Sequence, residues 1–220
     1  MSELSWMKKY ERRMKYFEKN HETLLSGSKP YIIRLDGHNF STFMKDKDKF
    51  ETKFVEAMIR TTKEIMKRTS NIIYGYTQSD EITLVFDSSK EPDFKGRIMK
   101  ITTIFAGLCT AIFNKEYPND KTPHFDARIF EVDTEDDIYN NILWRMRDGI
   151  RNSKAKKNSE LEWNQMDNYF RFGTLIKKIM VDKSGYNPIT KSNVIVQRST
   201  LLEISDYFPS IIELKRFLLE

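Results

Sequence analysis

The chain has 220 residues, of which 39% are hydrophobic and 13% aromatic, enough to bury one substantial core. Its single cysteine, Cys109, excludes an internal disulfide, and its first residues are charged where a secretory signal would be apolar. The 37 basic residues outnumber the 32 acidic ones, and the net charge of +5 suits a polyanionic partner. We expect a globular protein in a reducing, intracellular environment, with the cytoplasm as the first expectation and the mitochondrion as the alternative.

The first predicted element is a short buried strand at residues 31–35, because β-branched and aromatic side chains suit a pleated sheet. Asp36 and Gly37 follow this strand as a turn. Residues 50–68 repeat apolar side chains with the helical period and therefore predict an amphipathic helix.

Two β-rich segments follow, at residues 71–76 and 81–86, and they predict a hairpin whose connection contains Asp80. A second helix of about 18 residues is expected to begin near Lys95, since apolar residues recur at steps of three and four. Residues 125–132 alternate apolar and charged side chains, which is typical of a half-buried strand.

The C-terminal third predicts one helix, two strands and a closing helix. Thr134 and Asp137 have the spacing of a capping box for a helix that runs to about residue 147. Strands are expected at residues 174–181 and 193–204, joined by a turn-rich segment. Pro209 suits the first turn of a short closing helix.

The order strand, helix, strand, strand, helix, strand is that of a ferredoxin-like fold, an α+β class in which helices pack on an antiparallel sheet. Residues 1–134 would form this core, and residues 135–220 would pack on it as a small C-terminal extension within a single domain overall. The nearly apolar segment at 101–113 is too short to span a bilayer, so no membrane partner is expected.

Two acids are expected to lie close together, because the first and third strands of this fold are neighbours. Asp36 ends the first strand and Asp80 precedes the third. Paired carboxylates repel unless a cation lies between them, and oxygen ligands without His or Cys favour Mg²⁺. Two such ions can hold the attacking and leaving oxygens of a phosphoryl transfer. Glu81 is a third candidate catalytic carboxylate; alternatively, its side chain points to the opposite face of the strand from Asp80 and is structural. For Asp36 and Gly37 the alternative is that an isolated Asp-Gly pair simply begins a loop.

Phosphate binding needs cations or amides, and Arg97 and Lys100 stand at i and i+3 near a predicted helix start. That placement suits a triphosphate. The eight glycines form neither a Walker loop nor a dinucleotide-binding fingerprint. His21, His38 and His124 are interpreted as surface or packing residues, since no Cys or paired His spacing accompanies them.

A basic run with a single acid, Asp148, occupies the segment after residue 144 and could grip an RNA backbone. The alternative is a solvated helix end followed by a loop. The run consists of Arg145, Arg147, Arg151, Lys154, Lys156 and Lys157.

Four segments carry a family resemblance, in the order RLDGHNFSTF, YTQSDEITLVF, FDARIF and WRMRDGIRNS. Together they resemble the tRNA-His guanylyltransferase family, over a stretch from about Tyr10 to Val181. The resemblance implies a polymerase-palm-like core and a 3′-to-5′ nucleotidyltransferase that acts on tRNA or another structured RNA. In that chemistry ATP activates a 5′-monophosphate, and the 3′-hydroxyl of an incoming nucleotide such as GTP then displaces AMP. A homotetramer, a dimer of dimers, is also implied.

Residue by residue, the resemblance implies that Asp36, the Gly37 carbonyl and Asp80 bind two Mg²⁺ ions. Arg97 and Lys100 match triphosphate contacts. Asn152 matches an asparagine of the last motif and joins the RNA-binding set. The nucleotide-binding residues implied are Asp36, Gly37, His38, Asn39, Phe40, Ser41, Ser79, Asp80, Arg97 and Lys100.

One departure selects between branches of the family. Residues 150–153 read Ile-Arg-Asn-Ser where the tRNA-His enzymes carry a His-x-Asn-Asn type stretch, which points to the Thg1-like branch that repairs 5′-truncated RNA by templated addition. The segment 153–170 is also short for the family. The alternatives are the guanylyltransferase proper, which adds an extra 5′ guanosine, a palm-type nucleotide cyclase and a non-catalytic RNA-binding module. The acidic turn expected of a cyclase is absent, because Gln78 and Ser79 precede Asp80.

Overall fold

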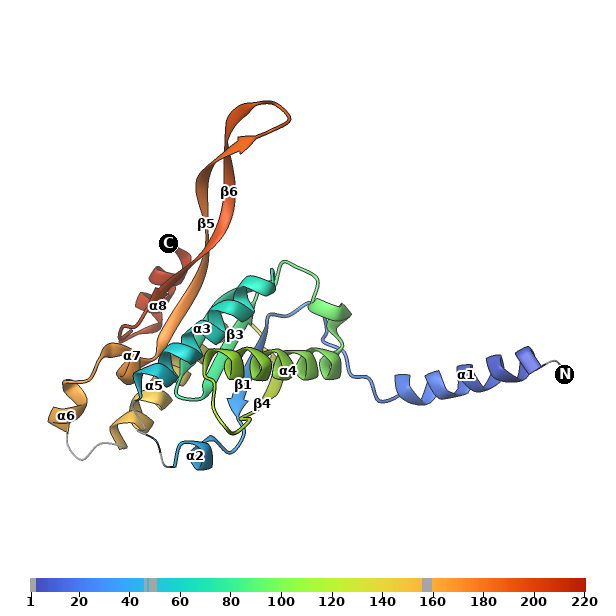
Figure 1. Ribbon diagram of the computed structural model, residues 1–220, viewed down its shortest axis with the longest axis horizontal. Helices are drawn as coiled ribbons and strands as arrows, with labels where there is room; N and C mark the ends of the chain where they lie inside the picture. Colours follow the sequence, from blue (N-terminus) through green and yellow to red (C-terminus); the bar gives the residue numbers. More distant parts are fainter. Residues whose placement is uncertain (1–2, 46, 48–50, 156–159) are drawn as a thin grey trace.

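The structure is a computed structural model that describes residues 3–45, 47, 51–155 and 160–220 (Figure 1), and the structural statements below concern these residues. The basic residues Lys156 and Lys157 lie outside the described residues. A central sheet, two helical layers, a long hairpin and an N-terminal helix make up the molecule.

The sheet is antiparallel, with the strand order β4-β1-β3-β2-β5-β6. Its first four strands have the order of the ferredoxin-like fold, which confirms the predicted class. The antiparallel pairing of β1 with β3 places Asp36 opposite Glu81. The strands are β1 Tyr31–Gly37, β2 Ile72–Gln78, β3 Glu81–Phe86, β4 Phe125–Glu131, β5 Thr174–Asn187 and β6 Ser192–Ile204.

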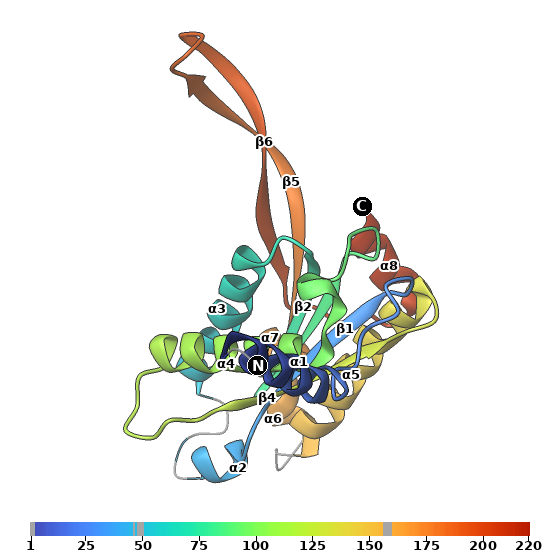
Figure 2. The same cartoon turned by 90° about the vertical axis from the view of Figure 1, so that its right-hand side faces the viewer.

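Helices cover both faces of the sheet, as Figure 2 shows from the side. The alternation along β1 explains this, because Ile33 is buried with the core beneath one helical layer and Ile32 with the core beneath the other. One layer consists of α3 (Thr52–Arg68) and α4 (Ile98–Glu116), and the other of α5 (Glu135–Ala155) and α8 (Ile211–Leu219). The remaining helices are α1 Glu3–Lys19, α2 Phe40–Phe43, the 3₁₀ helix η1 Asp93–Gly96, α6 Glu160–Asn164 and α7 Asn168–Phe172.

The capping box predicted for α5 is confirmed, but the helix is longer than predicted. The Asp137 N–H donates to Thr134 Oγ1 at 3.2 Å, and the Thr134 N–H donates to Asp137 Oδ2 at 3.0 Å. The helix continues to Ala155 because the following segment packs on its last turns. Ser153 is buried there, and Trp163 Nε1 donates to its hydroxyl at 2.9 Å.

Two predicted helix starts were early. α4 begins at Ile98, because Phe94, Lys95 and Gly96 have left-handed φ values of 52°, 58° and 70°, which an α-helix does not accommodate. Pro209 precedes α8, whose N-cap is Ser210 with its hydroxyl accepting from a backbone N–H at 3.3 Å.

The predicted connection at 182–192 is mostly strand. β5 and β6 stay paired out to Asn187 opposite Ser192, so the hairpin extends well beyond the rest of the sheet (Figure 1). This pairing satisfies backbone groups that a long loop would leave to water. The chain therefore has a projecting arm that the sequence pattern did not indicate.

α4 is, among the described residues, the one helix that by length and composition could cross a membrane. Its inner residues, including Ile101, Phe105 and Cys109, are buried in the core beneath the sheet. A core helix passes the same test of length and composition, so this property carries little weight.

Candidate active site

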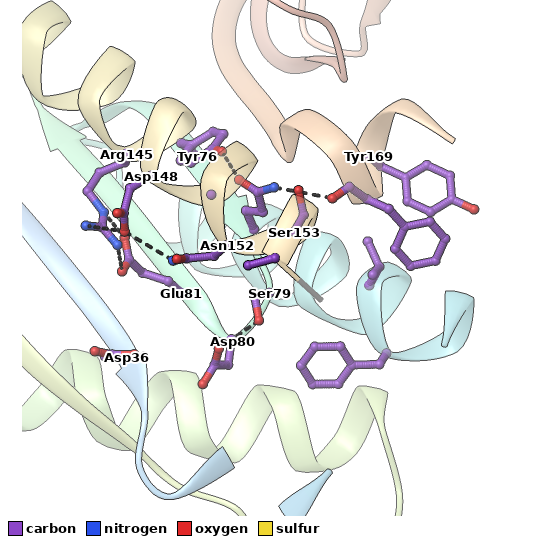
Figure 3. A pocket seen from close by; sticks show the side chains of 16 residues that line it. Asp36, Tyr76, Ser79, Asp80, Glu81, Arg145, Asp148, Asn152, Ser153 and Tyr169 are labelled. Atoms are coloured by element: carbon purple, nitrogen blue, oxygen red, sulfur yellow. Dashed lines mark hydrogen bonds and ion pairs between the residues drawn. The ribbon is translucent and has the colours of Figure 1, made fainter. Parts of the chain in front are cut away.

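The end of β1 meets the β2–β3 turn, as the strand order predicts. The Gly37 N–H donates to the Asp80 carbonyl at 3.0 Å, which places the two predicted metal-binding positions side by side along the backbone. Figure 3 shows Asp36 and Asp80 at the same edge of a cavity. The two acids thus come together through strand pairing, from residues 44 positions apart in the sequence (80 − 36).

The turn that carries Asp80 has a strained backbone. Ser79 and Asp80 alone connect the strands, and Ser79 has a φ of 54°. Asn39, after β1, has a φ of 55°. Left-handed conformations are uncommon for residues other than glycine and cluster at functional sites. The Ser79 hydroxyl donates to Asp80 Oδ1 at 2.9 Å and orients this carboxylate.

Two cavities adjoin this turn. The first has a volume of about 470 Å³ and lies against α5 and α7, with Gln78, Asn152 and Phe170 among its walls. The second, of about 520 Å³, lies against α2. Both cavities are lined by Phe54, Ser79 and Asp80. The Ser79–Asp80 turn therefore borders both cavities.

The oxygen atoms at this edge suit a hard cation. Asp36, Asp80 and the carbonyl of Gly37 are the donors that Mg²⁺ accepts, with water and substrate phosphate completing its shell. One oxygen of Asp36 accepts from Arg34 Nη2 at 3.1 Å, which leaves the other for a metal. Among the described residues no three His, Cys, Asp or Glu side chains gather as a metal cage, so a site here would rely on substrate oxygens.

Gly37 is required by close packing against Phe40. A Cβ at position 37 would overlap the Phe40 ring, which is buried among the aromatic side chains of the core. The ring holds the turn after β1 in place, and Phe40 and Ser41 line the second cavity. Lys45 also lines that cavity and is a cation that the sequence interpretation missed.

Glu81 forms ion pairs with two arginines, which fits its structural alternative, and its catalytic role stays a prediction. Its carboxylate accepts from Arg145 Nε at 2.5 Å and also from Arg145 Nη2, while Arg34 Nε lies 3.7 Å away. Burial raises the pKa of Glu81, and the two guanidinium groups partly offset this by stabilising the charged carboxylate. The arrangement fixes the floor of the first cavity beside Asp36.

Arg145 was predicted to grip RNA, and the structure places it elsewhere. Its side chain is only 14% exposed and forms ion pairs with Glu81 and Asp148 inside the first cavity. The prediction failed because Glu81, which lies far away in the sequence, is brought to it by the sheet. Arg145 therefore does not belong to the exposed basic face of α5, and it lines the first cavity instead.

The other basic residues of α5 share a different face. Arg147, Arg151 and Lys154 are exposed and recur at steps of four and three, which aligns them along one side of the helix. Each has a partner within the chain: Arg147 donates to the Pro209 carbonyl, Arg151 pairs with Asp148, and Lys154 lies over the Trp163 ring. Asn152 lies on the cavity side instead, with its amide 3.3 Å from Asp148.

A glutamine links α5, α7 and the Ser79–Asp80 turn, which the sequence did not indicate. Gln78 accepts from the Tyr76 hydroxyl at 2.6 Å and donates to the carbonyl groups of Phe170 and Arg171. α5 approaches it so closely that a Cβ on Gly149 would overlap the Gln78 amide. The position of this wall of the first cavity is thus determined by Gly149 and by the side-chain amide of Gln78, which lies two residues before Asp80.

Arg97 and Lys100 do not reach this site within one chain. The end of α4 near the site is marked by Thr110, whose hydroxyl accepts from the N–H of Phe125, the residue paired with Gly37. Arg97 precedes Thr110 by 13 residues (110 − 97), or about 20 Å at a helical rise of ~1.5 Å per residue. β3 begins at the site and runs away from it. α4, which follows β3 in the chain, therefore begins at the opposite edge of the sheet.

The three histidines are exposed, which confirms their interpretation as surface residues. His38 and His124 are nevertheless neighbours, with ring centroids 4.8 Å apart. The His38 N–H donates to the His124 carbonyl at 2.9 Å, and the Asn39 amide lies 2.8 Å from the His38 ring. His38 and Asn39 therefore stand at the rim of the site, next to Gly37.

Comparison with known proteins is consistent with this geometry. The family model described as tRNAHis guanylyltransferase, Thg1, matches residues 11–133. The chain is 27% identical over 225 residues to uncharacterized protein R259 of Acanthamoeba polyphaga mimivirus, covering 77% of each. It is 26% identical to the probable tRNA(His) guanylyltransferase of Mus musculus over 53% of this chain and 42% of that protein.

Solved structures extend the similarity to nearly the whole chain. A bacterial tRNA(HIS) guanylyltransferase (Thg1)-like protein in complex with GTP is 25% identical, with a TM-score of 0.76 over 94% of this chain and 95% of that one. A bacterial Thg1-like protein in complex with ATP is 26% identical, with the same TM-score over 95% and 97% of the two chains. The tRNA(His) guanylyltransferase of Saccharomyces cerevisiae, at 18% identity and a TM-score of 0.63 over 82% and 94%, shares the fold.

Proposed function

We propose that this chain, which belongs to the Thg1 family of nucleotidyltransferases, adds nucleotides to the 5′ end of a tRNA or another structured RNA in the 3′-to-5′ direction. The observation that carries the proposal is the pair of cavities that meet at the Ser79–Asp80 turn. A transfer between two substrates needs two spaces that open on one set of carboxylates. The bound GTP and ATP of the two bacterial Thg1-like proteins support a nucleotide in such a site.

The chemistry consists of two phosphoryl transfers. In the first, an oxygen of the RNA 5′-phosphate attacks the α-phosphorus of ATP and pyrophosphate leaves. In the second, the 3′-hydroxyl of the incoming nucleotide attacks the activated 5′-phosphate and AMP leaves. Mg²⁺ bound at Asp36, Asp80 and the Gly37 carbonyl would supply charge stabilisation for both.

The protein's own residues position the substrates. We assign the second cavity to the nucleoside triphosphate, because Lys45 and Ser41 offer polar contacts and Phe40 and Phe54 an apolar floor for the base. The first cavity is assigned to the 5′ end of the RNA, with Asn152 and Phe170 as contacts. His38 and Asn39, at the rim, remain proposed nucleotide contacts.

Arg97 and Lys100 enter the proposal only in another copy of the chain. Their distance from Asp36 within one chain excludes direct contact with a phosphate held there. If they bind the triphosphate, as the family resemblance implies, they do so at the site of a second chain in the proposed homo-oligomer. The homotetramer and the intracellular location stay predictions.

We propose templated repair of 5′-truncated tRNA as the specific activity. Ile150, where the resemblance expects a polar anticodon reader, supports it. The second candidate is the tRNA(His) guanylyltransferase proper, which the description of the family model favours. Pairing of the incoming nucleotide with the opposing strand would select the base in repair, whereas a guanylyltransferase needs no template.

The test compares substrates. The purified chain is incubated with Mg²⁺, ATP and each nucleoside triphosphate, together with a 5′-truncated tRNA-His or a truncated tRNA of another type. Repair predicts that both are extended by the base complementary to the opposing nucleotide. Extension of tRNA-His alone, or addition of guanosine whatever the opposing base, would establish the guanylyltransferase instead. No addition to any RNA would refute both.

A further inference from the structure

Trp144 presents an indole ring on the outside of α5, close to the candidate active site. The side chain is 55% exposed, although tryptophan is on average among the more buried residue types. The Arg145 guanidinium lies 4.7 Å from the centroid of the ring. Exposed tryptophan beside arginine is the combination most enriched where proteins make strong contacts with a partner.

The guanidinium beneath the ring is held in place from the sheet. Arg145 is only 14% exposed, and its Nε donates to the Glu81 carboxylate at 2.5 Å. Glu81 is in turn the residue opposite Asp36 in the β1–β3 ladder, and Figure 3 shows the Arg145–Glu81 contact on the same side of the site as Asp36. A cation over the face of an indole attracts it, so a fixed Arg145 also orients Trp144.

Trp144 lies between two rows of side chains on α5. With 3.6 residues per turn, Arg147 and Arg151 fall on one side of it and Arg145 and Asp148 on the other. The first row belongs to the exposed basic face, and the second lines the first cavity. The indole therefore separates residues expected to contact RNA phosphates from the cavity assigned to the 5′ end of the RNA.

The sheet face beside this part of α5 is open. In the β1–β4 ladder Asp36 is opposite Asp126, and Arg34 is opposite Arg128, so these side chains share one face. The Asp126 and Arg128 side chains are 48% and 61% exposed, which shows that no helix among the described residues covers the β4 part of that face. A flat group attached to a phosphate near Asp36 therefore has space on the outside of the molecule.

We propose that Trp144 is the platform on which the 5′-terminal nucleobase of the RNA substrate stacks. The RNA phosphates at the basic face and the 5′-phosphate at the carboxylates would flank that base on its two sides. Every base has a π-face, so stacking on an indole accepts any 5′-terminal base, which suits an enzyme that extends RNAs of different sequence. The inference rests on the proposed function, because it names a further contact with the same RNA.

The first experiment measures equilibrium binding of a 5′-truncated tRNA without nucleoside triphosphates, so that no transfer takes place. Trp144→Ala should weaken binding by roughly tenfold or more, as expected for the loss of one stacked base. Trp144→Phe should keep most of the affinity, because it retains an aromatic ring. Against an RNA whose 5′-terminal base is replaced by an abasic sugar, Trp144→Ala should change the affinity by less than about twofold, since the stacking partner is already missing.

Two controls fix the meaning of this coupling. Ile212→Ala removes a 74% exposed apolar side chain from α8 and should leave the affinity for both RNAs unchanged. An abasic sugar further from the 5′ end should leave the full effect of Trp144→Ala in place. Urea unfolding checks that the variants stay folded. An equal loss with the intact and the 5′-abasic RNA, or no loss with either, would overturn the proposal.

The second experiment observes the base directly. An RNA with 2-aminopurine as its 5′-terminal base is titrated with protein, because the emission of this base falls when it stacks on an aromatic ring. The wild type should quench the emission at saturation, and Trp144→Ala at saturation should not. The same change in emission with both proteins would place the base elsewhere and overturn the proposal.

The outcomes also separate this inference from the proposed function. A wild type that binds no RNA and adds no nucleotide would overturn both. A wild type that binds and extends RNA, without coupling between Trp144 and the 5′-terminal base, would overturn the stacking platform alone.

Discussion

At the scale of single residues, the clearest expectation concerns the two acids at the end of β1 and in the β2–β3 turn. Asp36→Ala and Asp80→Ala should each lower the rate of nucleotide addition by about three orders of magnitude, since each removes a proposed metal ligand from a phosphoryl-transfer site. Single-turnover extension of a truncated tRNA measures this. Asp133→Ala, an exposed acid paired with Lys29, is the control and should keep full activity. Near wild-type turnover in either site variant would refute the assignment.

A second residue-scale prediction concerns Glu81 and Arg145. Glu81→Gln should lower the free energy of unfolding by roughly 1 to 3 kcal/mol, because it removes the carboxylate shared by two largely buried guanidinium groups and leaves each with one acid, Asp36 for Arg34 and Asp148 for Arg145. Replacing both residues, Glu81→Leu with Arg145→Leu, should cost less than the sum of the single changes, because no unpaired charge remains at this pair. Urea unfolding of the wild type, Glu81→Leu, Arg145→Leu and the double variant measures the coupling. Additive costs would mean that the ion pair does not hold the cavity floor.

The sequence predicted that Asp36 and Asp80 meet, because strand order follows from a local pattern of apolar residues. It could not predict the partner of Glu81. Arg145 lies 64 residues later (145 − 81) on a helix whose rotation about its axis depends on packing against the sheet. Pairs made by tertiary packing leave no spacing signal in one sequence.

At the scale of elements, the exposed basic face of α5 is expected to contact phosphates, which carry no sequence information. The exposed ring of Trp144 lies three residues before Arg147, on the same side of the helix. Neutralising Arg147, Arg151 and Lys154 together should weaken binding of all RNAs alike. The logarithmic salt dependence should flatten by roughly one unit per lost phosphate contact. Binding titrations at several salt concentrations measure the slope, with Arg216→Gln on the exposed side of α8 as the control. An unchanged slope would identify this face as a solvated helix surface.

The direction of α4 shows where element-level prediction failed. The helix was found from its periodicity, and its start was predicted within a few residues. Its N-terminus was nevertheless assigned to the active site, although a helix after β3 must begin where β3 ends, at the opposite edge of the sheet. Chain direction was available from the same strand order that brought Asp36 to Asp80.

At the scale of the whole molecule, the position of Arg97 and Lys100 leads to a complementation test. A chain with Asp36→Ala and a chain with Arg97→Ala and Lys100→Ala should each be inactive alone. If these cations act on the site of another copy, mixed oligomers contain some sites with all groups intact, and activity should return on mixing after subunit exchange. No recovery, with exchange shown by mass, would place both functions in one chain or leave the cations without a role.

The molecule's two projections, α1 and the β5–β6 hairpin, were the least predictable parts of the fold. Their sequences carry ordinary helix and strand patterns, but the projecting parts do not pack into the compact core that positions the other elements. A projecting helix and a two-stranded arm are marginal alone, so a local sequence pattern gives little basis for predicting their lengths and directions.

The Ser79–Asp80 turn, as a wall common to both cavities, has a consequence for the order of events in catalysis. If a ligand in one cavity shifts these two residues, the other cavity changes shape, and the proposed binding of nucleotide and of RNA would then be linked. Linkage is reciprocal: whatever factor RNA adds to the affinity for a nucleotide, the nucleotide adds to the affinity for RNA. Under the proposed assignment of the two cavities, a turn of two residues would let the binding of one substrate change the affinity for the other before the reaction begins.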